Sequence, residues 1–465
     1  MTKKLLTAIL CAIMFMHISG CAKPENGNGE QTPQDVDWSF YNERAEEFVT
    51  AIAGGDFDAA VAMFDSTMKR MLPAAKLQND VWNVVLGQTG AFIGIHETEN
   101  LAVDGYFISF ITSEHENRGA TLRVVFSENG LISGLYIDGY PTIAIEEAVQ
   151  SDGFTNYPVI IGEGTDYPLD GILSIPDGVE GKLPAVVLVH GSGPNDMDET
   201  IFGNKPFRDV AEYLAKNGVA VIRYDKRTFT HGAALAQEFG GGLTVNEETI
   251  EDAILAAELL RSDRRIDEKR IFILGHSLGG MLAPRIHAEG GDFAGIISFA
   301  GSPRSLLDIS YDQQMAYIAE MPEGAEKTAS LAQMETYFYQ IDVLLSLSDD
   351  EAKATQVSGG VYAYYFKEMD GRPAAGYISE ISVPFLIMQG SKDFQVFADT
   401  DFVMWQELLE GRENVTFKLY DGLNHLFMAS ADGSITDFQE EYKVAGNVDP
   451  QVLADIVAWV NTISD

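Results

Sequence analysis

The segment that most constrains the fold is Gly-His-Ser-Leu-Gly at residues 275–279. It follows an apolar run, Ile271 to Leu274, with the length and β-branching of a buried strand, and residues 281–286 continue with helical spacing. A Gly-x-Ser-x-Gly turn between strand and helix lets the two backbones approach closely and exposes the serine hydroxyl. The motif alone is permissive in a chain with 44 glycines. Together with its strand–helix context, it predicts that Ser277 is a nucleophile.

A serine nucleophile needs a neighbouring imidazole to take its proton and a carboxylate to hold that imidazole in one tautomer. In a doubly wound sheet these groups lie on loops beyond the carboxyl ends of later strands, in the order Ser, Asp, His. Asp393 follows an expected strand at 384–389, and His425 follows another at 415–419. We therefore expect Asp393 and His425 to complete a catalytic triad with Ser277.

Other acidic and imidazole side chains are less well placed for these roles. Asp399 and Asp401 fall in the helix expected after Asp393. His287 lies on the helix that follows Ser277, far enough along to point away from the serine. Asp393 and His425 are therefore preferred.

The chain also offers two backbone donors for an oxyanion. The N–H of Leu278 follows the nucleophile and opens its helix. The second donor should come from the loop after the strand at 185–189, which reads His-Gly-Ser-Gly-Pro, because glycines bring backbone amides close to a substrate. We assign it to the N–H of Ser192, with Gly191 as the alternative. The side chain of His190 is expected to be a structural hydrogen-bonding group.

From about residue 150, short apolar strands alternate with amphipathic helices. This alternation predicts an α/β fold with a doubly wound, mostly parallel sheet over residues 150–465. Amphipathic helical stretches rich in Tyr, Met and Phe interrupt it at about 303–376, which we interpret as a helical insertion, or lid, over the sheet. The expected strands are 159–162, 169–175, 185–189, 219–224, 271–274, 295–299, 384–389 and 415–419, and the expected helices are 207–216, 247–260, 402–409 and 451–460.

Residues 37–140 are organised differently. Helical periodicity runs over 38–72, and its first helix is expected to bury Phe40, Ala45, Phe48, Val49 and Ile52. Period-two patterns follow, and the expected strands are 92–96, 101–111, 121–126 and 131–137. Helices followed by a meander of strands predict a small α+β domain.

No cluster of catalytic residue types appears in this N-terminal region. His96, Glu97, Glu99 and His115 are scattered along the expected strands, and we interpret them as surface residues. The region is expected to position the chain or gate the substrate rather than to carry out chemistry.

Residues 1–21 have the pattern of a targeting segment. Lys3 and Lys4 form a basic start, and the apolar run Leu5 to Met16 is too short to span a membrane as a helix. Ile-Ser-Gly-Cys then resembles the bacterial lipobox, which implies lipidation of Cys21 and an exported lipoprotein anchored to the cell envelope. The alternative is a soluble secreted protein that is cut elsewhere. Residues 22–36 are polar and rich in Gly, Asn, Glu and Pro, as expected of a flexible tether.

Composition narrows the possible partners. A formal net charge of -39 argues against nucleic acid, which requires a basic footprint, and against anionic lipid or polyanionic substrates. The membrane is therefore expected to be reached only through the lipid on Cys21. The two cysteines are Cys11 and Cys21, so we expect neither a disulfide nor a thiolate metal site after processing. The sequence also lacks a His-Glu-x-x-His motif and a phosphate-binding glycine-rich loop, so we expect no metal or organic cofactor.

These segments, in this order, resemble the α/β-hydrolase superfamily. The similarity covers about residues 155–465 and rests on His-Gly-Ser-Gly-Pro at 190–194, Tyr-Asp-Lys-Arg at 224–227, Gly-His-Ser-Leu-Gly at 275–279, Gln-Gly-Ser-Lys-Asp at 389–393 and Gly-Leu-Asn-His at 422–425. It is closest to bacterial carboxylesterases related to acyl-peptidases and dienelactone hydrolases. One departure is Thr228, where such enzymes usually have Gly, and it puts the shape of that loop in doubt. We expect residues 224–227 to be structural, with Asp225 and Arg227 paired.

The N-terminal block resembles the small cone-shaped α+β domain of the nuclear-transport-factor and cystatin-like folds. The resemblance as a whole implies a serine carboxylesterase that hydrolyses short- to medium-chain acyl esters of small molecules through an acyl-enzyme. Two alternatives stay open. A serine peptidase acting on short peptides would use the same triad, and a catalytically silent lipoprotein would bind its ligand without turnover. The sequence does not specify an oligomeric state.

Overall fold

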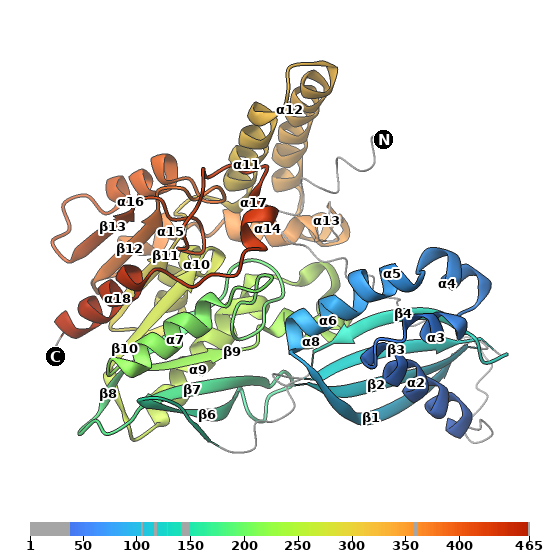
Figure 1. Ribbon diagram of the computed structural model, residues 1–465. Coiled ribbons are helices and arrows are strands. Elements are labelled where there is room, and N and C mark those ends of the chain that lie inside the picture. Colours follow the sequence, from blue (N-terminus) through green and yellow to red (C-terminus); the bar gives the residue numbers. More distant parts are fainter. Residues whose placement is uncertain are drawn as a thin grey trace. The chain divides into compact units, whose positions relative to one another are not determined.

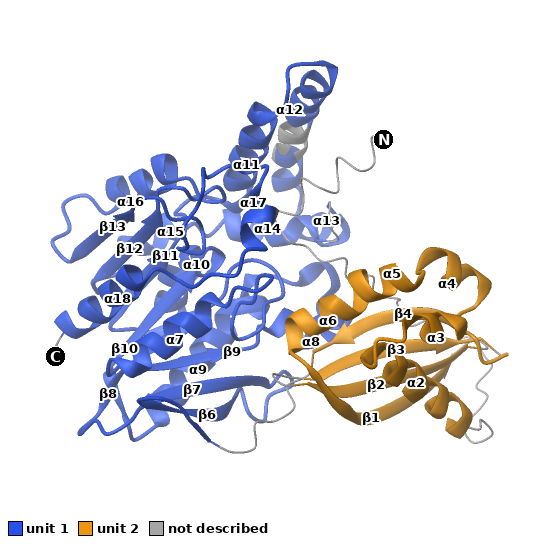
Figure 2. Ribbon diagram, viewed as in Figure 1, with its two compact units in different colours: residues 1–21, 146–465 blue, residues 22–145 orange. Residues whose placement is uncertain are grey.

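The computed structural model describes residues 38–463, apart from 104–105, 116–118, 128, 141–147 and 358–360. The predicted targeting segment, the tether and Cys21 lie outside the described residues. The chain divides into two compact units between residues 145 and 146, which we call the N-terminal unit and the C-terminal unit (Figure 2).

The N-terminal unit has helices first and strands after them. Its sheet is an antiparallel meander in the order β1-β2-β3-β4. The predicted α+β organisation is therefore confirmed, but the predicted strand at 101–111 joins the end of one strand to the start of the next. The elements are α2 (Trp38–Ala53), α3 (Phe57–Ala62), α4 (Ser66–Met71), α5 (Ala74–Lys76), η3 (Leu77–Trp82), α6 (Asn83–Thr89), β1 (Phe92–Val103), β2 (Tyr106–His115), β3 (Gly119–Phe126) and β4 (Ile132–Gly139).

The first helix of this unit buries a slightly different face from the one predicted. Phe40 is 45% exposed, whereas Tyr41 is 8% exposed and stacks on the ring of Phe107 with centroids 4.4 Å apart. Tyr41 lies four residues before Ala45, at the spacing of one helical turn, so it and not Phe40 continues the inward stripe. The other predicted positions, up to Ile52, are buried.

His115 is buried, which corrects the prediction that it lies on the surface. Its Nδ1 lies 2.9 Å from Thr89 Oγ1 and its Nε2 lies 2.9 Å from Ser113 Oγ. Burial lowers the pKa of His115 below its ordinary value. The reason is register, because alternate residues of β2 face the helices, and His115 shares that face with Ser113 and Ile111.

The C-terminal unit is built on a nine-stranded sheet in the order β13-β12-β11-β10-β8-β9-β7-β6-β5 (Figure 1). Strands β13 to β9 in this order pair in parallel, and β7, β6 and β5 add an antiparallel edge. This confirms the predicted doubly wound, mostly parallel sheet. The strands are β5 (Val149–Gln150), β6 (Phe154–Ile161), β7 (Leu169–Pro176), β8 (Leu183–Val189), β9 (Ala220–Tyr224), β10 (Ile266–His276), β11 (Gly295–Phe299), β12 (Phe385–Gly390) and β13 (Val415–Tyr420).

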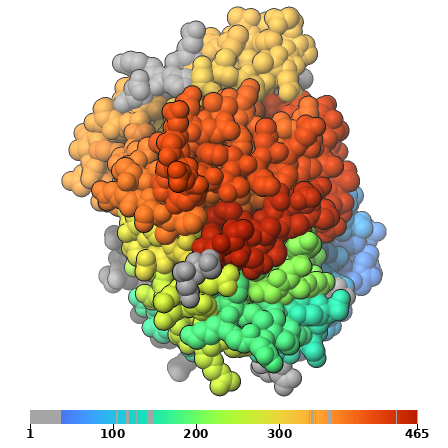
Figure 3. All heavy atoms as spheres, turned by 90° about the vertical axis from the view of Figure 1, so that its left-hand side faces the viewer, coloured from blue at the N-terminus to red at the C-terminus, as the bar shows by residue number. Residues whose placement is uncertain are grey.

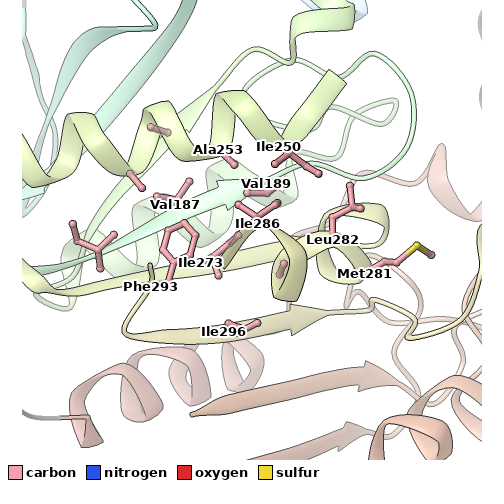
Figure 4. Packing of buried hydrophobic residues seen from close by; sticks show 14 of the residues in the cluster. Val187, Val189, Ile250, Ala253, Ile273, Met281, Leu282, Ile286, Phe293 and Ile296 are labelled. Atoms are coloured by element: carbon pink, nitrogen blue, oxygen red, sulfur yellow. The ribbon is translucent and has the colours of Figure 1, made fainter. Parts of the chain in front are cut away.

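Successive residues of each central strand point to opposite faces of the sheet and belong to two separate hydrophobic cores. Val187, Ile273 and Ile296 face helices α9 (Glu251–Ser262) and α10 (Leu278–Ile286), as Figure 4 shows. Their neighbours Val186, Phe272 and Ile297 face the opposite way, toward α7 (Pro206–Lys216) and α18 (Pro450–Thr462). The central strands are buried on both faces, which explains their nearly continuous apolar sequence.

Helices α7 and α18 lie side by side on the second face. In Figure 3 the red segment that contains α18 lies against the green segment that contains α7. Val452, Ile456 and Val460 of α18 are fully buried there. The second face of the sheet is thus covered by α18, a helix that comes after β13 in the chain.

Helices fill the segment between β11 and β12, where the helical insertion was predicted. They are α11 (Leu306–Glu320), α12 (Ala325–Ser346), α13 (Asp349–Ala354), α14 (Ala363–Asp370) and α15 (Ala374–Ile378), and α11 and α12 form a hairpin (Figure 1). Helix α8 (Arg227–Phe239) was not predicted, and it has non-helical backbone angles at His231. Within the described part of the chain, no helix is both long and apolar enough to cross a bilayer.

Candidate active site

Ser277 lies in a sharp turn between the end of β10 and the start of α10. Its backbone angles are φ 52° and ψ -113°, a conformation that costs an L-residue about 1–3 kcal/mol. The turn survives because Gly275 and Gly279 carry no side chain. A Cβ at Gly275 would lie 2.1 Å from the carbonyl oxygen of Gly279, and one at Gly279 would lie 2.2 Å from that of Val189. The Ser277 N–H donates to Phe299 O at 3.0 Å, which ties the turn to β11.

Asp393 and His425 meet beyond the carboxyl ends of β12 and β13. His425 Nδ1 lies 2.7 Å from Asp393 Oδ2, and both side chains are buried. Asp393 Oδ1 accepts the N–H groups of Gln395 and Val396 at 2.8 and 2.9 Å, and Gln389 Nε2 donates to Oδ2 at 2.6 Å. A carboxylate held by this many donors fixes Nδ1 of the histidine as its proton-bearing nitrogen and leaves Nε2 as a base.

The loops that carry the three predicted triad residues converge. His276, the residue before Ser277, has its ring centroid 4.7 Å from that of His425. Its Nε2 lies 3.1 Å from the carbonyl oxygen of His425. A Cβ at Gly191 would lie 3.2 Å from Ser277 Cβ, so the loop after β8 also reaches the serine.

The rival acids and the rival imidazole are engaged elsewhere. Asp401 accepts hydrogen bonds from Arg304 and Ser302, and Asp399 is exposed. His287 Nδ1 accepts the N–H of Phe293 at 3.0 Å, at the far end of α10. Their placement agrees with the preference for Asp393 and His425.

The two predicted oxyanion donors differ in how they are presented. Leu278 is the first residue of α10, where a backbone N–H has no acceptor within the helix. The N–H of Gly191, the alternative donor, already donates to Glu199 Oε1 at 2.6 Å. This leaves the N–H of Ser192 as the candidate from the loop after β8.

Glu199 and His276 form a buried ion pair that the sequence analysis did not identify. His276 Nδ1 lies 2.9 Å from Glu199 Oε2, and its Nε2–H donates to His425 O. Burial alone would lower the pKa of His276, but the charge and hydrogen bond of Glu199 raise it above its ordinary value. Burial opposes ionisation of Glu199 as well, yet His276 holds the pKa of that carboxyl below its ordinary value. The pair therefore joins the loop after β8 to the loop that carries His425.

Lys226 is a second charged residue that contacts the loop after β8. Its Nζ donates to Gly191 O at 2.8 Å and lies 2.5 Å from Glu248 Oε1. Tyr365, on α14 of the insertion, donates its hydroxyl to Glu248 Oε2 at 2.6 Å. The sequence signal that could have identified Lys226 is its position. It is a charged residue just after the wholly buried strand β9, at the edge of the sheet where ligands bind in folds of this kind.

The remaining residues of 224–227 pair differently from the prediction. Arg227 donates to Asp252 Oδ2 at 3.0 Å and to Glu251 Oε2 at 2.8 Å, both on α9. Asp225 accepts the N–H of Met197 at 2.7 Å. The side chain of Arg227 is thus paired with two carboxylates of α9.

His190 has the structural surroundings predicted for it. Its Nε2 lies 3.0 Å from the carbonyl oxygen of Asp196, to which it donates. Burial lowers the pKa of His190 to about 4, so the ring is neutral at pH 7. A neutral ring in this position stabilises the turn of the loop after β8.

A small cavity lies between α10 and the insertion. Met281 and Leu282 of α10 line it together with residues at the start of α11 and at the junction of α14 with α15. Its described lining includes none of the three predicted triad residues: it consists of Met281, Leu282, Arg285, Arg304, Ser305, Leu306, Met369, Asp370, Arg372, Pro373 and Ala374.

Comparison with known families gives two matches. Residues 186–434 match the model of the alpha/beta hydrolase family. Residues 45–135 match a family described as a protein of unknown function, DUF3887. The first match contains Ser277, Asp393 and His425, and the second lies within the N-terminal unit.

Among curated proteins, the chain is similar to esterase EstD of Thermotoga maritima. The two are 33% identical over 422 residues, which is 90% of this chain and 95% of the relative. The similarity therefore includes both units.

Two solved structures are similar to part of the chain. An esterase of Pyrococcus furiosus has a TM-score of 0.41 and 18% identity, and covers 69% of this chain and 97% of its own. Est1E of Butyrivibrio proteoclasticus has a TM-score of 0.39 and 16% identity, and covers 65% of this chain and 99% of its own.

Proposed function

The chain belongs to the α/β-hydrolase family, and on that premise we propose that it is a serine carboxylesterase with Ser277 as nucleophile, His425 as general base and Asp393 as the carboxylate that orients it. The observation that carries the proposal is the conjunction of a strained, turn-borne Ser277 with a buried Asp393–His425 hydrogen bond of 2.7 Å. The 33% identity to an esterase along almost the whole length of both proteins supports the choice of esters as substrates.

The proposed reaction has two halves. His425 Nε2 takes the proton of Ser277 Oγ as this oxygen attacks the ester carbonyl carbon, and the carbonyl oxygen becomes an oxyanion held by the N–H groups of Leu278 and Ser192. The oxyanion collapses, the bond to the alkoxy group breaks, and His425 protonates the leaving alcohol. Water, deprotonated by His425, then attacks the acyl-enzyme, and breakdown of the second oxyanion releases the acid and returns the proton to Ser277.

We propose short- to medium-chain acyl esters as the substrate class. The net charge of -39 disfavours anionic substrates, which supports uncharged esters. Since members of one fold host many specificities, the acyl length is a property of the loops and the insertion and must be measured.

The test uses p-nitrophenyl esters of increasing acyl length and a fluorophosphonate probe that labels activated serines. The wild-type protein should hydrolyse the shorter esters and bind the probe covalently. Ser277→Ala should lose both, whereas Ser382→Ala, at an exposed serine before β12, should keep both. Labelling that survives in Ser277→Ala would assign the nucleophile to another residue, and a wild type that is inert toward every ester would contradict the esterase assignment.

We also propose that Cys21 is lipidated and anchors the protein to the cell envelope. The support is the sequence alone: a basic start, a short apolar run and the lipobox-like Ile-Ser-Gly-Cys. Metabolic labelling with an alkynyl fatty acid should mark the wild-type protein, and Cys21→Ser should abolish the mark and release the protein from the membrane fraction. Membrane retention of the unlabelled variant would contradict the anchor.

A further inference from the structure

Both peptide groups of Gly191 form hydrogen bonds with buried charged side chains. Its N–H donates to Glu199 Oε1 at 2.6 Å, and its carbonyl oxygen accepts from Lys226 Nζ at 2.8 Å. Glu199 is paired with His276, and Lys226 is paired with Glu248. All four of these charged side chains are buried, so solvent screens neither of the two hydrogen bonds to Gly191.

The hydrogen bond from Lys226 to the carbonyl oxygen of Gly191 fixes the orientation of the whole peptide group. A peptide group is planar and trans, so the C=O of one residue and the N–H of the next point in opposite directions in one plane. The N–H that shares the plane with Gly191 C=O is that of Ser192. Holding Gly191 O against Lys226 therefore determines where the Ser192 N–H points.

The contacts of Lys226 continue, through Glu248, into the helical insertion. Glu248 Oε1 forms an ion pair with Lys226 Nζ, and Glu248 Oε2 accepts a hydrogen bond from the hydroxyl of Tyr365 on α14. The buried ammonium group of Lys226 has three N–H donors, and the carbonyl oxygen of Gly191 is an acceptor for one of them beside the carboxylate of Glu248. Two hydrogen bonds and the Lys226–Glu248 ion pair between them thus connect Tyr365 of the insertion with Gly191 in the loop after β8.

We propose that Lys226 is a positioning residue of the esterase reaction, which aims the Ser192 N–H at the oxyanion, and that Tyr365 holds Lys226 in place through Glu248. This inference rests on the proposed function. Lys226 touches no reacting atom, and it acts only through the Gly191–Ser192 peptide. Its removal lowers the stabilisation of the oxyanion and leaves ground-state binding of the ester almost unchanged.

The main variant is the double substitution Lys226→Met with Glu248→Gln, made in the full chain. It removes both charges together, so that no uncompensated charge stays buried. Losing an oxyanion donor costs about 10²–10³ in rate, and a misdirected donor should cost about 10- to 100-fold in kcat. KM for p-nitrophenyl butyrate should stay within about threefold, because the lost interaction is made only in the transition state.

A trifluoromethyl ketone separates positioning from a general loss of structure. The serine oxygen attacks the carbonyl carbon of the ketone and forms a hemiketal whose oxygen is negatively charged. The inhibition constant of the ketone therefore reports on the oxyanion donors. The inhibition constant should rise in the double variant by about the same factor as kcat/KM falls. Tyr365→Phe removes only the far hydrogen bond, and it should shift kcat and the inhibition constant in the same direction by about two- to fivefold.

The matched control is Arg227→Met with Asp252→Asn. This pair is as deeply buried as Lys226–Glu248 and begins one residue further along the chain, and Arg227 donates its hydrogen bonds to Asp252 and Glu251 of α9. It should lower the unfolding temperature and leave kcat and the inhibition constant within about twofold.

The outcomes separate the two proposals. Normal kcat and normal ketone affinity in a folded Lys226→Met, Glu248→Gln protein would overturn the positioning role and leave the esterase assignment intact. If that double variant does not fold, an unchanged ketone affinity in Tyr365→Phe overturns the role instead. Equal losses of kcat in the double variant and in the control, without a matching loss of ketone affinity, would also reduce Lys226 to a structural residue. A wild type that hydrolyses no ester overturns both.

Discussion

At the residue scale, the site places two imidazoles of different character side by side. The carboxylate of Glu199 lies 2.9 Å from His276 Nδ1, and the carbonyl oxygen of His425 lies 3.1 Å from its Nε2, and this arrangement favours the charged form of His276. His425 has a carboxylate at Nδ1 alone. The first ring is therefore held at both nitrogens, while Nε2 of the second is the nitrogen to which we assign proton transfer.

Asp393→Asn should abolish most of the activity without disturbing the fold. An amide cannot hold Nδ1 as the proton-bearing nitrogen, so the wrong tautomer of His425 would face Ser277, at a cost of about 10⁴ in kcat in the well-studied serine triad. KM and the unfolding temperature should change little. Asp399→Asn, at an exposed residue in the next turn of chain, is the control and should behave as wild type. Comparable kcat values for the two variants would remove Asp393 from the proposed triad.

The Glu199–His276 pair should give stability a definite pH dependence. The pKa of His276 is raised above 6.5, so its stabilisation is complete below about pH 6.5 and is lost as pH rises through the raised value. Glu199 contributes the opposite limb, since its lowered pKa means that its stabilisation is present above about pH 4.5 and lost as pH falls through the lowered value.

Urea denaturation between pH 6.5 and 9 tests the basic limb, because His190, whose pKa is lowered to about 4, stays neutral throughout that range. The free energy of unfolding of the wild type should fall with rising pH across this interval. In Glu199→Gln the fall should be smaller, because His276 then has little reason to be charged. Identical slopes for the two proteins would show that the pair is not ionised.

Single residues also show how far sequence can reach into the site. Ser277, Asp393 and His425 could be predicted because motif, loop position and chain order are readable along one dimension. Glu199 and Lys226 could not, because each acts through a partner that only the tertiary structure brings near. His115 was assigned to the surface for the same reason, since its burial depends on which face of β2 the helices cover.

At the scale of elements, the β10–α10 elbow should tolerate no added methyl group at its glycines. Gly275→Ala would put a Cβ 2.1 Å from the Gly279 carbonyl oxygen, and backbone lies on both sides of that contact. The variant should unfold or lose its activity toward esters. Gly376→Ala, within α15, meets nothing within 4 Å and should raise the free energy of unfolding by about 0.5–1 kcal/mol. Circular dichroism melts and ester turnover would decide between them.

Element limits were predictable where burial on both faces leaves a clear apolar run. The strand predicted at 295–299 has those limits in the structure, and the one predicted at 271–274 is the apolar end of a longer β10. Helix α8 was missed because the kink at His231 and the glycine run that follows it obscure helical periodicity. The insertion could be recognised only as helical, since its helices pack against partners that the pattern does not name.

At the scale of the whole molecule, the two units have separate hydrophobic cores. Phe48 is fully buried in the N-terminal unit, and Phe272 is fully buried under α18 in the C-terminal unit. A Phe→Ala change in a core typically costs about 3–5 kcal/mol. Each substitution should therefore destabilise its own unit.

Calorimetry of Phe48→Ala and Phe272→Ala would show whether that independence holds. Phe48→Ala should lower the transition of the N-terminal unit and leave kcat toward a small p-nitrophenyl ester unchanged at a temperature below that transition. Phe272→Ala should lower the other transition together with the temperature at which activity is lost. A single transition that moves equally in both variants would mean that the two cores unfold as one.

The position of α18 has a consequence for how the chain is made. Val452, Ile456 and Val460 cover the face of the sheet to which Val186 and Phe272 belong, so a helix synthesised after β13 covers strands synthesised long before it. A nascent chain that stops before residue 450 exposes this apolar face, however many strands it already contains. Such long-range closure is intrinsically slow and leaves the unfinished chain prone to aggregation. Synthesis of α18 therefore marks the moment at which the growing polypeptide can bury this face within itself.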